Sequence, residues 1–287
     1  MTKLFRYELR RVLCSKLFFV VLLVCLGFGC LTLTTVTVRG TAHTAPFSPW
    51  SFGDYLSRLL PLLCLGELCL VGVFTSRRER AVQTITCAAP VDPARYALVR
   101  WLAVLAGTVI LWLAVIALAL GFYGSLFGRL DYSGLILPAL LTLLPPTVFC
   151  LGAGLALGRR SPALVYAVMG GVLLLCWLPL PQGLAFSLGG FFAQYPLELD
   201  HLDPMFSMTA NLAGGRCLWF TAGAGILLYQ LFQTKRNLKK PDPDFDPEWE
   251  RSGWRQWKQQ CRKAFHFGAH RPQKRRKAAA SIAGRSS

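Results

Sequence analysis

Long apolar stretches alternate with short basic segments along this chain. Six of the apolar stretches meet or approach the roughly 20 residues that a helix needs to cross the hydrocarbon core of a bilayer. They cover residues 17–36, 55–75, 101–122, 132–158, 163–180 and 212–233. The first, third, fourth and fifth contain no charged residue. The pattern predicts an all-α fold, a polytopic membrane helix bundle with six transmembrane helices.

The composition strengthens this interpretation. Of the 287 residues, 54% are hydrophobic and 16% are charged, whereas soluble domains carry about a quarter charged residues. The first apolar stretch is too long for the core of a cleavable signal peptide, and no small-residue cleavage site follows it. We therefore expect residues 17–36 to stay in the mature protein as the first span.

Lys and Arg are distributed unevenly between the two predicted sides of the membrane. They gather before the first span, between spans two and three, between spans four and five, and in the tail, residues 234–287. The other connecting segments hold only Arg39 and Arg129, and Arg216 lies at the outer end of the sixth span. Cytoplasmic segments carry the excess of Lys and Arg, so both termini are predicted to be cytoplasmic. We interpret the net charge of +17 as topology signals and lipid headgroup contacts, and we expect no nucleic acid partner.

Residues 1–16 show the periodicity of an amphipathic helix. Apolar and basic side chains fall on opposite faces: Phe5, Leu9, Val12 and Leu13 on one, Lys3, Arg6, Arg10 and Arg11 on the other. Such a helix lies in the interface of the membrane. The alternative is a plain basic stretch ahead of the first span. The tail at the other end of the chain mixes Pro, Trp and many basic residues, and we expect it to be partly disordered.

Residues that carry intramembrane chemistry are scarce. All four histidines lie outside the predicted spans, and the ten cysteines form no CxxC pair. The sequence contains no HExxH pattern and no Walker-type glycine loop. We therefore expect no catalytic residue, no cofactor and no metal site. The chain is not expected to be an enzyme.

One acidic residue, Glu67, lies inside a predicted span, the second. A carboxyl group at membrane depth is costly and is often retained for function. A hydrogen-bonded structural carboxyl is the alternative interpretation. Arg58 and Arg216 lie near the outer ends of the second and sixth spans, where long side chains can reach the interface.

The loop between the second and third spans, residues 76–100, is the most informative segment. It reads RRERAVQTITCAAPVDPARYALVR from Arg77 to Arg100. A charged cluster is followed by a short amphipathic stretch, which ends at Pro90-Val91. A single cation, Arg100, stands at the start of the third span. Pro90 and Pro93 would end a helix sharply, so we expect a short helical element with charged flanks.

This loop resembles that of the permease subunits of ABC-2 type transporters. In that family the loop typically opens with Glu-Arg-Gly-Thr, closes with a small residue and Pro-Val, and reaches a Lys or Arg about nine residues later. Here Glu79-Arg80 match the opening, Pro90-Val91 match the close, and Arg100 takes the place of the cation. Residues 81–82 are Ala-Val where the family has Gly-Thr. The N-terminal interfacial helix, six spans and inner termini also match the family's plan.

The resemblance implies a function and partners. It implies a permease that pairs with a second copy or a paralogue and docks on an ABC ATPase subunit, which hydrolyses ATP to drive export. It places the chain in a cell membrane as a multi-pass protein, with a bacterial plasma membrane as the expected location. The loop would be the coupling element. The expected docking residues are Glu79, Arg80, Thr84, Ile85, Thr86 and Arg95.

A second function remains open at this point. A multi-pass membrane scaffold or sensor without transport activity could recruit partners through the basic tail, residues 234–287. An ATPase that co-purifies with the chain would distinguish the two functions.

Overall fold

The structure, a computed structural model, describes residues 2–76, 93–128, 133–181, 183–199 and 204–239. Its regular elements are α1 (Thr2–Leu13), α2 (Lys16–Thr35), η1 (Thr37–Arg39), α3 (Pro49–Thr75), α5 (Pro93–Phe127), η2 (Ser133–Leu135), α6 (Ile136–Arg160), α7 (Pro162–Trp177), α8 (Gly189–Gln194), η3 (Tyr195–Glu198) and α9 (Ala210–Lys239). Within these ranges the fold is all-helical, which confirms the predicted class.

Among the residues that the structure describes, four helices are long and apolar enough to cross a bilayer, which indicates a membrane protein. They are α2 together with η1, and α3, α5 and α6. They correspond to the first four predicted spans. Helix α7 is apolar but has only 16 residues, about 24 Å at the rise of an α-helix. Helix α9 has 30 residues and carries more polar side chains than the four.

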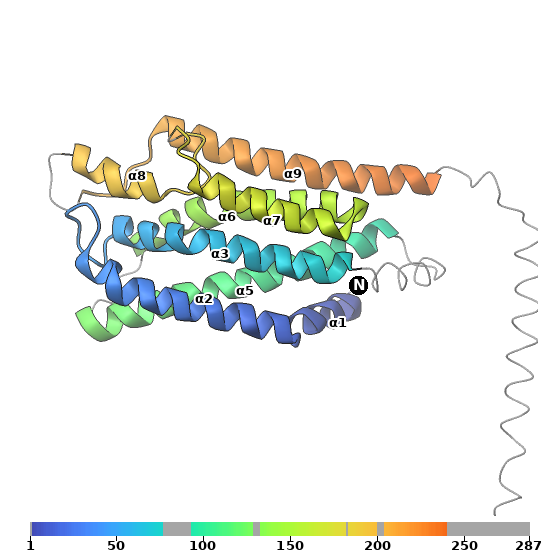
Figure 1. Ribbon diagram of the computed structural model, residues 1–287, viewed down its shortest axis with the longest axis horizontal. Coiled ribbons are helices and arrows are strands. Elements are labelled where there is room, and N and C mark those ends of the chain that lie inside the picture. The colour runs from blue at the N-terminus through green and yellow to red at the C-terminus, as the bar shows by residue number, and fades with distance from the viewer. Residues whose placement is uncertain (1, 77–92, 129–132, 182, 200–203, 240–287) are drawn as a thin grey trace, which may run out of the picture. The chain divides into compact units, whose positions relative to one another are not determined.

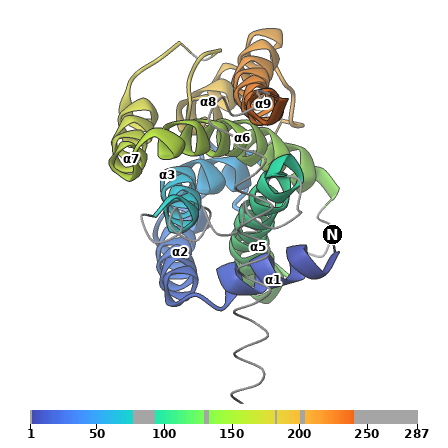
Figure 2. The ribbon, with the colours of Figure 1, turned by 90° about the vertical axis from the view of Figure 1, so that its right-hand side faces the viewer.

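The long helices lie side by side, and α3 is the central one (Figures 1 and 2). Helix α3 packs against α2, α5, α6 and α7. Its side chains are buried along its whole length, from Trp50 to Phe74. By contrast, α2 keeps one side exposed, including Phe19, Leu23 and Leu31. A residue in the middle of α3 is therefore surrounded by protein, whereas the outer face of α2 is available to lipid.

Serine caps define two of the helix starts. The Ser15 hydroxyl accepts a hydrogen bond from the Phe18 amide at 3.1 Å and donates one to the Val12 carbonyl at 2.7 Å. The same hydroxyl therefore provides a hydrogen-bond partner for a backbone carbonyl at the end of α1 and for a backbone amide at the beginning of α2. Ser48 accepts from the Ser51 amide at 3.2 Å and is followed by Pro49 at the first position of α3.

Several helices extend past the predicted boundaries. Helix α3 begins at Pro49 rather than at residue 55, and α5 covers Pro93–Phe127 rather than 101–122. Helix α9 covers Ala210–Lys239 rather than 212–233. Hydropathy marks only the part of a helix that lies in the apolar core, while caps and tertiary contacts decide where the helix ends.

Helices α6 and α9 approach each other at a pair of glycines. A Cβ atom added at Gly223 would lie 2.5 Å from the Phe149 amide nitrogen, and one added at Gly152 would lie 2.8 Å from the Gly223 carbonyl oxygen. Side chains at either position would push the two backbones apart. Small residues allow this kind of close packing in membranes. The Gln230 amide then donates to the Gly152 carbonyl across the same contact, at 3.0 Å.

The segment before α9 is held by an aromatic cluster at the beginning of α3. Trp50 contacts the rings of Phe191, Phe192 and Phe206, with centroid distances of 5.8, 6.2 and 5.0 Å. Its indole nitrogen donates to the Pro204 carbonyl at 2.8 Å. The cluster ties α8 and the chain that follows it to α3, which explains why α3 begins earlier than hydropathy indicates.

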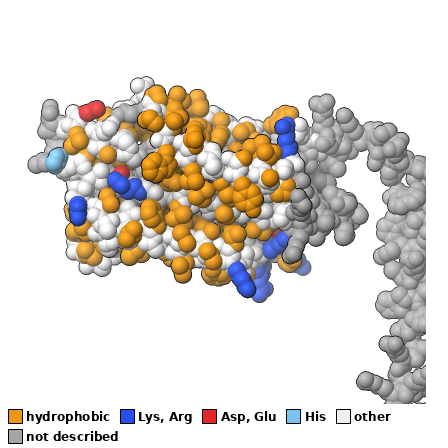
Figure 3. All heavy atoms as spheres, viewed as in Figure 1, with side chains coloured by type: hydrophobic (Ala, Val, Ile, Leu, Met, Phe, Trp, Pro, Cys, Tyr) orange, Lys and Arg blue, Asp and Glu red, His pale blue; other side chains and the backbone are white. Residues whose placement is uncertain are grey.

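The face of the bundle in Figure 3 is largely apolar along its length, and more Lys and Arg side chains gather at the right-hand end than elsewhere on it. Exposed leucines and aromatic residues come from several helices, among them Leu23, Leu113, Leu174 and Phe232. A soluble monomer rarely exposes apolar patches of this extent. This surface fits contact with lipid chains.

Candidate functional site

A buried ionic cluster joins three helices at the basic end of the bundle. Glu8 of α1 is only 2% exposed. Its Oε1 atom accepts a hydrogen bond from the Tyr96 hydroxyl at 3.2 Å and lies 3.9 Å from Nε of Arg100. Its Oε2 atom lies 3.8 Å from Nη1 of Arg11. One carboxyl group therefore faces two guanidinium groups, one from its own helix and one from α5.

Aromatic rings complete this cluster. The guanidinium carbon of Arg100 lies 5.2 Å from the centroid of the Phe74 ring and 4.8 Å from that of Tyr96. The guanidinium carbon of Arg11 lies 5.8 Å from the Phe74 centroid. Such distances permit cation–π attraction. We call Glu8, Arg11, Phe74, Tyr96 and Arg100 the Glu8 cluster.

The Glu8 cluster connects both stems of the 76–100 loop to α1. Phe74 lies at the end of α3, where the loop begins, and Arg100 lies in α5, where the loop motif ends. Contacts between α1 and α5 extend this connection, because Val12 packs against Gly107. The arrangement makes the N-terminal helix part of the bundle at the base of the loop.

Sequence reasoning missed Glu8, although a signal was present. Glu8 follows Phe5 by three residues and precedes Val12 by four, so it falls on the apolar side of the amphipathic helix. An acidic residue on an apolar face indicates a buried partner. The helical prediction for residues 1–16 itself is confirmed over Thr2–Leu13. Arg100, predicted as the cation ahead of the third span, supplies that partner.

Glu67 lies in the middle of α3 and is fully buried. Neither of its carboxyl oxygens has a hydrogen-bond partner within the described part of the chain. Three thiols belong to the same region: Cys64 one turn earlier, Cys150 of α6 and Cys176 of α7. No group of three or more metal-ligating side chains occurs among the described residues.

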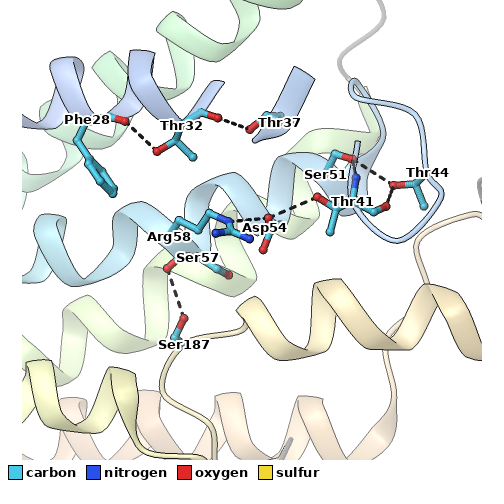
Figure 4. A network of polar contacts seen from close by, with 10 residues as sticks. All are labelled: Phe28, Thr32, Thr37, Thr41, Thr44, Ser51, Asp54, Ser57, Arg58 and Ser187. Carbon is cyan, nitrogen blue, oxygen red and sulfur yellow. Dashed lines mark hydrogen bonds and ion pairs between the residues drawn. The ribbon is translucent and has the colours of Figure 1, made fainter. Parts of the chain in front are cut away.

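A polar network lies around the beginning of α3 (Figure 4). Asp54 is 3% exposed and accepts from Nε of Arg58 at 2.8 Å and from the Thr41 hydroxyl at 3.4 Å. Ser51 accepts from the Thr41 amide at 3.1 Å, and the Ser187 hydroxyl donates to the Ser57 carbonyl at 3.3 Å. Arg58 was expected to extend toward the interface, and its side chain is 46% exposed. It also pairs with Asp54 within its own helix, because α3 starts early enough to include Asp54.

Arg216 differs from its expected role at the membrane interface. It is 3% exposed, and its two terminal nitrogens donate to the carbonyls of Ala185 and Phe186 at 2.7 and 3.1 Å. Trp219 donates to the Leu184 carbonyl at 3.2 Å. These bonds attach the segment before α8 to α9. Arg216 therefore holds irregular backbone, a role that its position in the sequence did not reveal.

Of the predicted docking residues, one is described. Glu79, Arg80, Thr84, Ile85 and Thr86 lie outside the described residues. Arg95 lies in the first turns of α5, is exposed, and lines a groove between α5 and α1. The prediction for these positions therefore stays a prediction.

Comparisons of the chain with protein-family models, with curated proteins and with solved structures gave no match.

Proposed function

We propose that this chain is the permease subunit of an ABC-2 type exporter. It would pair with a second permease, a copy of itself or a paralogue, and dock on a separate ABC ATPase. The proposal rests on the order of three sequence features: Glu79-Arg80 and Pro90-Val91 between α3 and α5, and Arg100 in the first turns of α5. It also implies a multi-pass protein of the cell membrane, with both termini in the cytoplasm. The expected location is a bacterial plasma membrane.

The observation that supports the proposal best is the connection of Arg100 to Glu8 and Phe74. A coupling loop can move a helix bundle only if its stems are firmly attached to the helices that must move. Force applied to the loop would reach α5 through Arg100, α3 through Phe74 and α1 through Glu8. Helix α3 passes through the middle of the bundle and carries Glu67, so movement at the loop would reach the buried carboxyl group.

The proposed topology predicts which residues face the cytoplasm. Thiol labelling of single-cysteine variants in intact cells should place Arg80, Arg160 and Arg262 inside, and Arg39 and Asp200 outside, because Lys and Arg are retained on the cytoplasmic side. The native cysteines are replaced in the parent protein, and permeabilised cells serve as the labelling control. Labelling of position 160 from the outside would contradict the six-span topology.

The coupling role of the loop predicts that its substitution weakens ATPase binding while the bundle stays intact. Reversing both charges, Glu79→Lys with Arg80→Glu, should lower the amount of ATPase that co-purifies, since complementary charges orient such contacts. Ile85→Asp should lower it more, because an apolar anchor in a partner's cleft carries a large share of the binding energy, on the order of 2 kcal/mol. The measurement is affinity purification of the tagged chain from its native membrane, followed by quantification of any ABC ATPase.

Arg160→Glu provides the matched control, because it reverses an exposed cation of the other predicted inner loop. It should leave ATPase binding unchanged, and membrane abundance should be equal for all variants. Full ATPase binding by both loop variants would remove the loop as the coupling element. If no ATPase binds even the unaltered chain, the permease proposal fails and the scaffold function of the basic tail replaces it.

A further inference from the structure

A groove lies between α1 and the first turns of α5. Phe5 and Leu9 of α1 line one wall, and Leu98 and Leu102 of α5 line the other. Three cationic side chains also border it, Lys3 and Arg6 of α1 and Arg95 of α5. The groove has a volume of about 870 Å³. That size lies in the range of sites that bind small amphiphilic molecules.

The groove combines two kinds of surface. Its walls are mainly apolar, and Leu98 and Leu102 remain 43% and 45% exposed. Its charged border is entirely cationic, since none of the described residues that line it is acidic. Glu8 of the same helix is buried against Tyr96 and does not border the groove. A ligand that fills it needs an apolar body and an anionic group at one end.

We propose that this groove binds an anionic phospholipid. One acyl chain would lie against Phe5, Leu9 and Leu102, and the phosphate would lie between the ammonium of Lys3 and the guanidinium of Arg6. Basic pockets beside membrane helices recognise anionic headgroups in this way. The groove lies beside the basic helix α1, and the proposal places the boundary between lipid chains and headgroups at this level of the bundle. Only the assignment of this end to the cytoplasmic leaflet depends on the proposed topology.

Native mass spectrometry of the purified full chain tests the site. The protein is released from nanodiscs that contain equal amounts of phosphatidylglycerol and phosphatidylcholine with the same acyl chains. We expect phosphatidylglycerol to be retained preferentially. The variant Lys3→Gln with Arg6→Gln should lose most of this preference, since Arg95 remains as the only described cation that lines the groove. A juxtamembrane cation contributes about fivefold to the binding of an anionic lipid, so the two together contribute roughly 30-fold.

The matched control removes the same charge outside the groove. Arg10 and Lys16 are exposed and do not line it, so Arg10→Gln with Lys16→Gln should keep the preference. A second variant, Leu98→Trp, fills the groove from a half-exposed position and should lower retention of both lipids. The Leu98→Trp variant therefore distinguishes binding at a site between α1 and α5 from a general affinity of basic helices for anionic membranes.

Three results would overturn the proposal. An equal loss of preference in the control variant would mean diffuse electrostatic attraction without a site. Equal retention of the two lipids by the unaltered chain would mean that the cations do not select the headgroup. Displacement of phosphatidylglycerol by millimolar glycerol phosphate would mean that a soluble phosphate suffices as the ligand. None of these measurements involves an ATPase, so the lipid site and the permease function can fail separately.

Discussion

Replacing Glu8 with glutamine is expected to lower the free energy of unfolding by on the order of 3 kcal/mol, the scale seen when one partner of a buried ion pair is removed. The substitution removes the carboxylate 3.9 Å from Arg100, a residue that is itself only 8% exposed. The amide that replaces it can still accept a hydrogen bond from Tyr96 but carries no charge. The measurement is equilibrium unfolding of the purified protein in mixed micelles.

A second ion pair of this chain supplies the control. Arg58 pairs with Asp54 at 2.8 Å, but its side chain is 46% exposed. Asp54 is buried, but it keeps the Thr41 hydroxyl as a donor and the glutamine amide can also donate to it. Arg58→Gln should therefore lower the free energy of unfolding by less than Glu8→Gln does. If the two substitutions are equally mild, the Glu8 cluster contributes no more than the half-exposed Arg58–Asp54 pair.

The double variant Glu8→Gln with Arg100→Gln separates stability from coupling. It removes both charges of the Glu8–Arg100 pair, and the remaining guanidinium, that of Arg11, is 37% exposed and accessible to water. The double variant should therefore recover part of the stability that Glu8→Gln loses, and the difference measures the interaction between the two residues. If the cluster transmits movement from the loop, this double variant should still fail to restore function. Complementation of a strain that lacks the chain, at equal protein abundance, measures function. A double variant that is fully active would limit the cluster to a stabilising role.

Replacing Glu67 with leucine is expected to stabilise the fold and to abolish function. Both carboxyl oxygens of Glu67 are buried and have no hydrogen-bond partner within the described residues. A buried polar group without a partner lowers stability by about 1–3 kcal/mol, and leucine removes it with little change of volume. A destabilising group at membrane depth is expected to persist because function requires it. Complementation should therefore fall at least tenfold while the free energy of unfolding rises.

Thr142 provides the comparison for this experiment. Its hydroxyl is also buried, without a hydrogen-bond partner in the described part of the chain, but it cannot ionise. Thr142→Val should increase stability slightly and leave complementation unchanged. Glu67→Gln, which keeps the size and polarity of the side chain, should fail in complementation if the ionisable group is needed. Normal complementation by Glu67→Leu at normal abundance would remove Glu67 from the functional residues, and a loss of stability would reveal a partner for the carboxyl group.

The sequence predicted one of the two buried acidic residues of the site, Glu67, and did not predict the other, Glu8. Glu67 was identified from the sequence because it interrupts an apolar span, a feature that needs no knowledge of neighbours. Glu8 was missed because it lies outside the spans, among basic residues of an interfacial pattern. Its importance depends on Tyr96 and Arg100, which are about ninety residues away in the chain and meet it only in the folded protein.

The same distinction applies to the arginines near the ends of helices. The sequence suggested that Arg58 and Arg216 extend to the interface, because long cationic side chains near span ends commonly do so. Arg58 pairs with Asp54 because α3 begins at Pro49 and so includes both residues. The Ser48 cap and the packing of Trp50 against α8 determine where α3 begins. Arg216 is buried because its guanidinium group donates hydrogen bonds to two backbone carbonyls of the segment before α8.

The sequence by itself determined that this chain is helical and apolar enough to cross a membrane, and where most of its helices lie. Hydrophobicity and helix length are local properties, so a run such as residues 17–36 is recognisable without its neighbours. Only the tertiary structure decided that α3 is the central helix, that α1 is attached to α5 through Glu8, and that a groove remains between them. A buried charge must find its partner across the fold, and no local pattern specifies which distant residue that will be.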